Sequence, residues 1–175
     1  FGQDIIVAHT AARNIAEFFM LPFSVMGVTM ANYCGQNTGA GRMDRIRGGI
    51  RQALILTWIW AVGMILLSFT ASPALAGMVT GSDNPVIRST AALYLRFNTL
   101  FYFAPAAISI LRNGLQGMGD HVTPVCSSMI ELVGKIIAAF FLADIFQYWG
   151  IIVAEPVVWV LMVIPLIAKM RKMVK

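Results

Sequence analysis

The segment IRQALILTWIWAVGMILLSFTAS, residues Ile50–Ser72, is apolar almost throughout and is long enough to cross a lipid bilayer as an α-helix. An α-helix rises 1.5 Å per residue, so about 20 apolar residues span the hydrocarbon core. Four further stretches have the same character: Ile5–Tyr33, Arg88–Leu111, Val122–Ala143 and Ile151–Lys169. The sequence therefore predicts an all-α polytopic membrane protein with five transmembrane helices.

The composition excludes an ordinary soluble protein. Hydrophobic residues make up 58% of the 175 residues and charged residues only 12%, whereas soluble domains carry roughly 25% charged residues. The basic residues behind the net charge of +5 concentrate in 42–51 and 169–175. Such flanks are typical of the cytoplasmic ends of membrane helices, so we expect the lipid bilayer as a partner and no nucleic acid.

The distribution of basic residues also predicts the orientation. The loop that carries Arg42, Arg45, Arg47 and Arg51 is assigned to the cytoplasm by the positive-inside rule. Alternation then places the loops Pro73–Pro85 and Asp144–Gly150 outside, and the loop Leu115–His121 and the C-terminal end inside. An odd number of helices that begins outside leads us to expect a further helix before Phe1.

Charged residues inside the apolar stretches are the candidate functional residues. They are Glu17, Arg96, Glu131, Lys135 and Glu155. A charged side chain at the centre of a bilayer costs about 2.5–3.5 kcal/mol or more. Each of these residues is therefore expected to face the bundle interior, to have a partner, and to mark a pathway for ions or substrate.

The role of each charge has two interpretations. Glu17 either takes part in ion coupling and substrate contact or pairs with Arg13, one helical turn earlier. Glu131 and Lys135 are four residues apart, which favours an ion pair, with a role in coupling as the alternative. Glu155 either belongs to the site or is an acid at a helix start beside Pro156.

Three residues of the third stretch are a further candidate group. Tyr94, Arg96 and Asn98 are expected either to line a cavity or to supply a partner for one of the acids. His9 and His121 lie near opposite membrane faces, and no two acids are at helical contact spacing. We therefore expect neither an enzyme nor a metal site.

A glycine-rich segment follows the first stretch. Gly35, Gly39 and Gly41 are expected to break the helix, because glycine tolerates left-handed backbone and permits close approach of a neighbouring helix. Together with Gln36 and Arg42, these residues form a predicted cytoplasmic loop.

Four segments of the chain resemble the multidrug and toxic compound extrusion (MATE) transporters. They are Gly35-Gln36-Asn37-Thr38-Gly39-Ala40-Gly41-Arg42, Ala8-His9, Leu111–Asp120 with the later Glu131-Leu132-Val133-Gly134-Lys135, and Gly150–Trp159 with Glu155-Pro156. The resemblance implies helices two to six of a six-helix C-terminal lobe. This sequence would then lack the first helix of this lobe and the whole N-terminal lobe. The N-terminal lobe is an expected partner of this part.

The resemblance also implies a function. We expect a secondary active antiporter of the bacterial cytoplasmic (inner) membrane that exports drugs or amphipathic, often cationic compounds in exchange for Na⁺ or H⁺, with no other cofactor. Some members carry a carboxylate in the helix that corresponds to Arg88–Leu111, and this chain has none there, which leaves the coupling ion open. The alternatives are a lipid-linked oligosaccharide flippase of the same superfamily and an inactive structural fragment or subunit.

Overall fold

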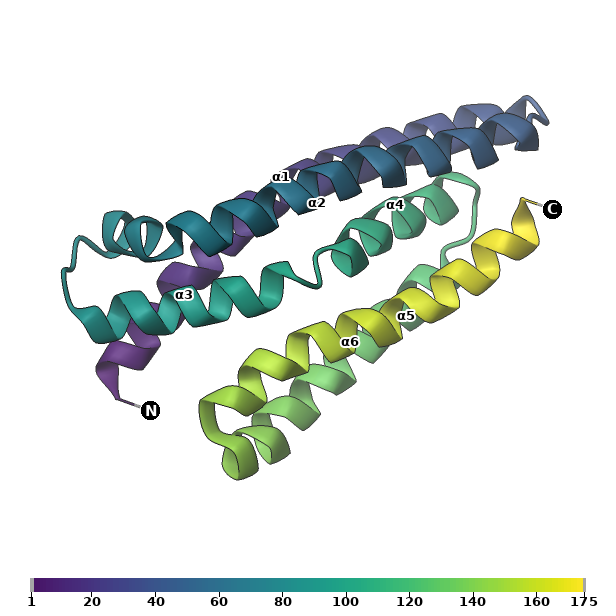
Figure 1. Cartoon of the computed structure of the whole chain (residues 1–175). Helices are drawn as coiled ribbons and strands as arrows, with labels where there is room; N and C mark the ends of the chain where they lie inside the picture. Colours follow the sequence, from purple (N-terminus) through teal and green to yellow (C-terminus); the bar gives the residue numbers. More distant parts are fainter. Residues whose placement is uncertain (1, 175) are drawn as a thin grey trace.

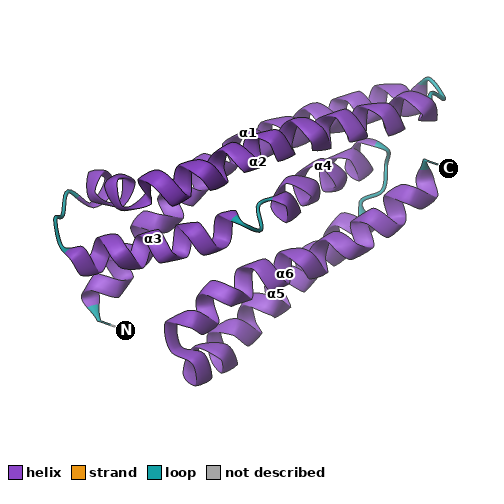
Figure 2. Ribbon diagram, in the orientation of Figure 1, coloured by secondary structure: helices purple, strands orange, loops and turns teal. Residues whose placement is uncertain are grey.

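The computed structural model describes residues 2–174, with the side chains of 139 and 142–147 outside this description. It contains helices α1 (Gln3–Gly39), α2 (Met43–Thr80), α3 (Pro85–Thr99), α4 (Phe103–Gly117), α5 (Val122–Ile137) and α6 (Ala143–Met173), with a π-helical segment, Ala138–Leu142, between the last two. No strand occurs among the described residues, and the connections are short (Figure 2). The predicted all-helical class is confirmed.

The helices form a long bundle whose turns gather at its two ends, except for the α3–α4 connection, which lies part-way along it (Figure 1). α1 and α2 run antiparallel, and α3 and α4 follow each other along this pair. α5 and α6 form a second antiparallel pair beside α4. The α1–α2 turn, the α4–α5 turn and the C-terminal end all lie at one end, which we call the arginine-rich end because it carries Arg42–Arg51 and Arg171.

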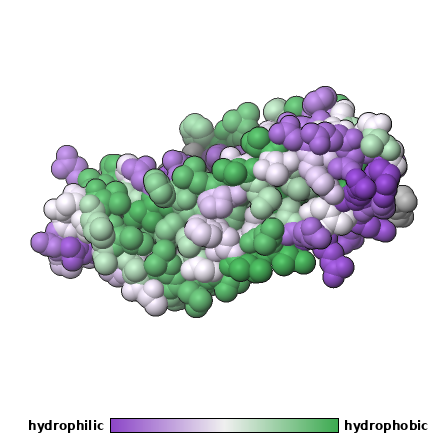
Figure 3. Space-filling view, turned by 90° about the horizontal axis from the view of Figure 1, so that it is seen from above, coloured by the Kyte–Doolittle hydropathy of each residue, from purple (hydrophilic) through white to green (hydrophobic). Residues whose placement is uncertain are grey.

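The surface has the distribution expected of a membrane-embedded bundle. Hydrophobic residues cover most of the middle of the face in Figure 3, and hydrophilic residues gather toward the two ends. Among the described residues, three helices are long and apolar enough to span a membrane: α1, α2 and the Tyr148–Met173 part of α6. The structure thus supports a multi-pass membrane protein, with three qualifying helices in place of the five that we expected.

The predicted continuous helix Arg88–Leu111 is wrong, because the chain forms two helices of 15 residues each, α3 and α4. Pro105 has no backbone N–H and cannot donate to the carbonyl of Phe101. The junction instead uses tighter bonds, from the Tyr102 amide to the Thr99 carbonyl (3.1 Å) and from the Ala104 amide to the Phe101 carbonyl (2.9 Å). The break allows α3 and α4 to follow different directions along α1 and α2.

The predicted break at the glycine-rich segment is also mostly wrong. α1 continues through Gly35 to Gly39, and only the tight turn Ala40–Arg42 separates it from α2. Gly41 adopts a left-handed conformation with φ of 67°. Gly35 lies against the backbone of Gly117 on α4, where any added Cβ would be 3.1 Å from the Gly117 carbonyl oxygen. Gly35 therefore serves helix–helix packing, as small residues do in membranes, and not loop flexibility.

The two predicted outer loops are shorter than expected. α2 extends through Pro73 to Thr80, where Gly81 (φ 62°) ends the helix and its amide donates to the Gly77 carbonyl. Pro73 frees the carbonyl of Phe69, four residues earlier, and the Arg96 guanidinium on α3 donates to this carbonyl at 3.1 Å. A partner from a neighbouring helix thus lets α2 continue. The predicted loop Asp144–Gly150 likewise lies within the bounds of α6.

Candidate transport site

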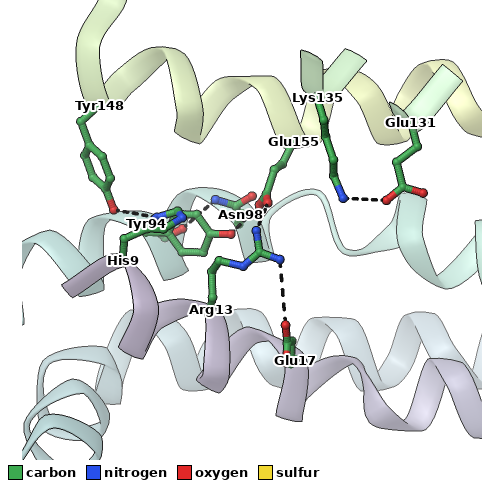
Figure 4. Close-up of polar contacts among 9 residues, drawn as sticks. All are labelled: His9, Arg13, Glu17, Tyr94, Asn98, Glu131, Lys135, Tyr148 and Glu155. Atoms are coloured by element: carbon green, nitrogen blue, oxygen red, sulfur yellow. Dashed lines mark hydrogen bonds and ion pairs between the residues drawn. The ribbon is translucent and has the colours of Figure 1, made fainter. Parts of the chain in front are cut away.

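Ionisable side chains from four helices converge on one cleft in the bundle (Figure 4). α1 contributes Arg13 and Glu17, α3 contributes Tyr94, α5 contributes Glu131 and Lys135, and α6 contributes Glu155. The cleft has a volume of about 170 Å³. We call these six residues the charge cluster. Glu17 and Glu155 lie near the middle of their helices, far from either end of the bundle.

Glu155 is the most enclosed acid of the charge cluster, with a side chain only 16% exposed. One carboxylate oxygen accepts a hydrogen bond from the Arg13 guanidinium at 3.2 Å. The other oxygen accepts the hydroxyl of Tyr94, which is 2% exposed. Glu155 therefore joins α1, α3 and α6, and its interactions go well beyond those of an acid at a helix start.

Arg13 is shared between two acids. Besides Glu155, it faces Glu17 with 3.9 Å between its Nη2 and the Glu17 Oε1. The expected pairing of Arg13 with Glu17 is thus present but loose, and the Glu17 side chain stays 71% exposed. Two carboxylates beside one guanidinium leave an excess of negative charge in this part of the cleft.

Glu131 and Lys135 form the ion pair that their spacing predicts, with 2.8 Å between Lys135 Nζ and Glu131 Oε1. Arg112 of α4 approaches the other carboxylate oxygen of Glu131 at 3.8 Å. In this half of the cleft two cations therefore surround one carboxylate. The charges beside α1 and α6 thus sum to one net negative charge, whereas Glu131 and Lys135 balance and the nearby Arg112, which lies outside the charge cluster, makes the surroundings of Glu131 net positive.

Tyr94 lines the cleft, whereas the other two candidates on α3, Arg96 and Asn98, do not. Tyr94 reaches Glu155, and Asn98 is 1% exposed and donates to the Tyr94 carbonyl at 3.2 Å. Arg96 points away toward α2, where its guanidinium binds the Phe69 carbonyl and lies 5.9 Å from the centre of the Phe69 ring. The structure thus brings Tyr94 to the acids and leaves Arg96 outside the cleft.

Sequence reasoning did not include His9 or Tyr148 among the site residues. His9 packs edge-on against Tyr94 with ring centroids 5.0 Å apart, and its Nδ1 lies 3.4 Å from the Tyr148 hydroxyl. His9, Arg13 and Glu17 follow one another at intervals of four residues, which places all three on one face of α1. This spacing is the signal that predicts His9 as a neighbour of the charge cluster.

The glycine-rich candidates lie at the arginine-rich end and do not reach the cleft. There Arg42 donates two hydrogen bonds to Asp44, at 3.0 and 2.9 Å. Gln36 and Gly39 lie in the last turn of α1, and Gly41 lies in the turn between α1 and α2 together with Arg42.

Among the described side chains, no three His, Cys, Asp or Glu residues gather as a metal site would require. The cleft instead offers paired charges at the middle of a helical membrane bundle. Ionisable residues in such a place are typical of proteins that move ions or solutes, because they mark the pathway. Fold and site together define a membrane transport protein.

The comparison with known families agrees with this class. Residues 1–141 match the MatE family, and because they make up most of the chain, the chain belongs to this family. Members of the family are transporters and not enzymes. No curated protein and no solved structure gives a significant match.

Proposed function

We propose that this chain is part of a secondary active antiporter that exports drugs or toxic organic cations in exchange for Na⁺ or H⁺. The observation that carries the proposal is the sharing of Arg13 between Glu155 and Glu17 in the charge cluster. Two carboxylates with one guanidinium have the capacity to take one further positive charge. A cationic compound and a coupling ion would then compete for the same carboxylates.

Competition of this kind gives antiport a physical basis. A proton or Na⁺ on Glu155 weakens its ion pair with Arg13 and removes the negative charge that attracts an organic cation. Release of the ion restores that charge. The Tyr94 hydroxyl holds one carboxylate oxygen of Glu155, so this acid presents its charge in a fixed direction. In the proposed cycle, each bound cation excludes the other.

The resemblance supplies the larger setting of the proposal. The chain corresponds to helices two to six of a C-terminal lobe, and the N-terminal lobe would form the other wall of the cavity. The 71% exposed side chain of Glu17 suits such a wall, because it is free to face a cavity. Alternating access then proceeds by rocking of the two lobes around the site.

A lipid-linked oligosaccharide flippase is the second candidate function. It would need unpaired basic residues for a phosphate group. The two bases that line the cleft, Arg13 and Lys135, are both already beside carboxylates. The pairing favours a cation over a phosphate as the substrate charge. An inactive fragment or structural subunit is the remaining alternative.

The test is efflux of a cationic fluorescent dye from cells that express the transporter, with the H⁺ and Na⁺ gradients collapsed separately. We expect Glu155→Gln to slow efflux about tenfold or more, the loss of about 1.4 kcal/mol of differential binding. Glu17→Gln should slow it less, because the Glu17 carboxylate is more exposed. Collapse of one gradient should stop export by the wild type and thereby name the coupling ion.

Asp83→Asn is the matched control, because this acid lies outside the cleft and is 96% exposed. Efflux equal to wild type in both the Glu155→Gln and Glu17→Gln variants, at unchanged expression, would contradict the proposed site. If the wild type exports no dye at all, the flippase or a structural subunit becomes the better interpretation.

A further inference from the structure

A second and larger groove opens at the arginine-rich end, between α2, α4 and α6. Its volume is about 520 Å³, three times that of the transport cleft. Its walls are mostly apolar and include Leu54, Trp58 and Leu111, and two arginines, Arg47 and Arg171, are part of its lining. None of its lining residues belongs to the charge cluster.

The two arginines of the groove lack an anionic partner within the described part of the chain. Both are exposed, and neither makes a hydrogen bond or ion pair with a described residue. The acids at this end are already engaged, Asp44 with Arg42 and Asp120 with Lys169. The groove therefore combines two free guanidinium groups with mostly apolar walls.

We propose that this groove binds one anionic phospholipid of the bilayer. Its phosphate group accepts hydrogen bonds from Arg47 and Arg171, and its acyl chain lies along the apolar wall beside Trp58. Guanidinium groups bind phosphate through paired, charge-assisted hydrogen bonds. Basic pockets between membrane helices at the cytoplasmic face are the expected sites for such head groups.

The chemistry of the groove favours a lipid over a second protein chain. A polar mouth that leads into an apolar slot matches an amphiphile with one charged end. The arginine-rich end is also the end that the charge distribution places at the cytoplasmic face, where anionic lipids give the membrane its negative surface potential. The ligand is then present wherever the protein is inserted.

Fluorescence of Trp58 provides the test. The chain is reconstituted into phosphatidylcholine vesicles that contain a small fraction of phosphatidylglycerol with dibrominated acyl chains, which quench nearby tryptophan. The Trp58 signal is isolated as the difference between the wild type and Trp58→Phe. The Trp58 indole already donates to the Phe103 carbonyl at 3.2 Å, so its position is fixed. The same titration with dibrominated phosphatidylcholine gives the reference.

We expect quenching of Trp58 to require about 25-fold less brominated phosphatidylglycerol than brominated phosphatidylcholine, about fivefold for each arginine. The double variant Arg47→Gln/Arg171→Gln should lose this preference. The control Arg45→Gln/Lys172→Gln removes the same charge at the same end but outside the groove lining, and should keep most of it. Circular dichroism checks that every variant retains its helices.

The proposal would be overturned by equal quenching by both lipids, by an unchanged preference in the Arg47→Gln/Arg171→Gln variant, or by an equal loss in the control variant. The last result would mean that the whole basic surface, and not the groove, attracts the lipid. Quenching that falls as protein density in the vesicles rises would also overturn it, because a second copy would then cover the groove.

Discussion

At the scale of single residues, Asp120 links the turn between α4 and α5 to helix α6. It lies in the turn between α4 and α5, and its Oδ1 accepts the amide of Val122 at 3.1 Å. Its Oδ2 accepts the Thr123 hydroxyl at 2.6 Å and lies 3.7 Å from Lys169 on α6. Burial alone raises the pKa of Asp120, but the Thr123 hydrogen bonds and Lys169 outweigh it and lower the pKa below the ordinary 3.8.

The lowered pKa predicts a pH-dependent contribution to stability. A carboxyl whose pKa is lower in the folded state stabilises the fold above its ordinary pKa and loses this effect as the pH falls. We expect Asp120→Asn to reduce the free energy of unfolding at pH 7 by about 0.5–1 kcal/mol, the usual worth of such an ion pair, because the amide loses the negative charge that faces Lys169. The difference from wild type should shrink as the pH falls below about 5 and on through the folded-state pKa of Asp120, which lies below 3.8.

Denaturant unfolding in bicelles, followed by circular dichroism at a series of pH values, measures this difference. Asp120→Ala is the comparison variant, because it also removes the acceptor for the Val122 amide and should be the less stable of the two at every pH. A difference between wild type and Asp120→Asn that does not change with pH would contradict a role for the charge.

Residue spacing predicts contacts within one helix but not between distant helices. The Glu131–Lys135 pair followed from two positions on one face of a helix, and the structure confirms it. The bonds from Arg13 and Tyr94 to Glu155 join residues 142 and 61 positions apart. Such contacts depend on how α1, α3 and α6 pack, and no periodicity in the sequence contains that information.

At the scale of whole elements, α1 and α4 approach each other closely at Gly35 and Gly117. A Cβ added at Gly117 would overlap the backbone of Ala31 on α1. Backbone atoms cannot move aside as the end of a flexible side chain can. The contact therefore depends on the absence of a side chain at residue 117.

We expect Gly117→Ala to destabilise the bundle by about 1–3 kcal/mol, the usual range for overpacking. The matched control is Gly63→Ala in α2, where an added Cβ meets nothing within 4 Å. This control should be neutral or more stable by about 0.5–1 kcal/mol, because alanine favours helix over glycine. The midpoint of thermal unfolding in detergent measures both. Equal midpoints for the two variants would contradict the close approach.

The extent of each helix was less predictable than its existence. Hydropathy located the long apolar helices, but it did not identify the break between α3 and α4. Pro105 and Pro73 show why: the first lies in the first turn of a new helix, α4, while the second lies inside α2. The difference depends on whether a neighbour satisfies the freed carbonyl, as Arg96 does for Phe69. A single sequence does not contain this information.

At the scale of the whole molecule, the three segments at the arginine-rich end agree with the orientation predicted from charge. The α1–α2 turn, the α4–α5 turn and the C-terminal end share one end of the bundle, and the α2–α3 turn lies at the other (Figure 1). The alternation of loops that the sequence predicted is thus compatible with one membrane plane, although several loop bounds changed.

Labelling with a membrane-impermeant maleimide tests this orientation. In a background that carries Cys34→Ala and Cys126→Ala, we expect Asp83→Cys to react in intact cells, because residue 83 lies in the α2–α3 turn. Ala40→Cys, in the α1–α2 turn, should react only after the membrane is permeabilised. Both positions are exposed in the bundle. The reverse pattern would show that the arginine-rich end faces outside.

The hydrogen bond from Arg96 to the Phe69 carbonyl also constrains the order of events during biosynthesis. α3 is short and carries Arg88 and Arg96, so it is a poor substrate for the insertion machinery when it emerges alone. α1 and α2 are made first and both contact α3 in the finished bundle. We therefore expect the carbonyl that Pro73 frees in α2 to be available when Arg96 emerges, so that α2 assists the insertion of α3.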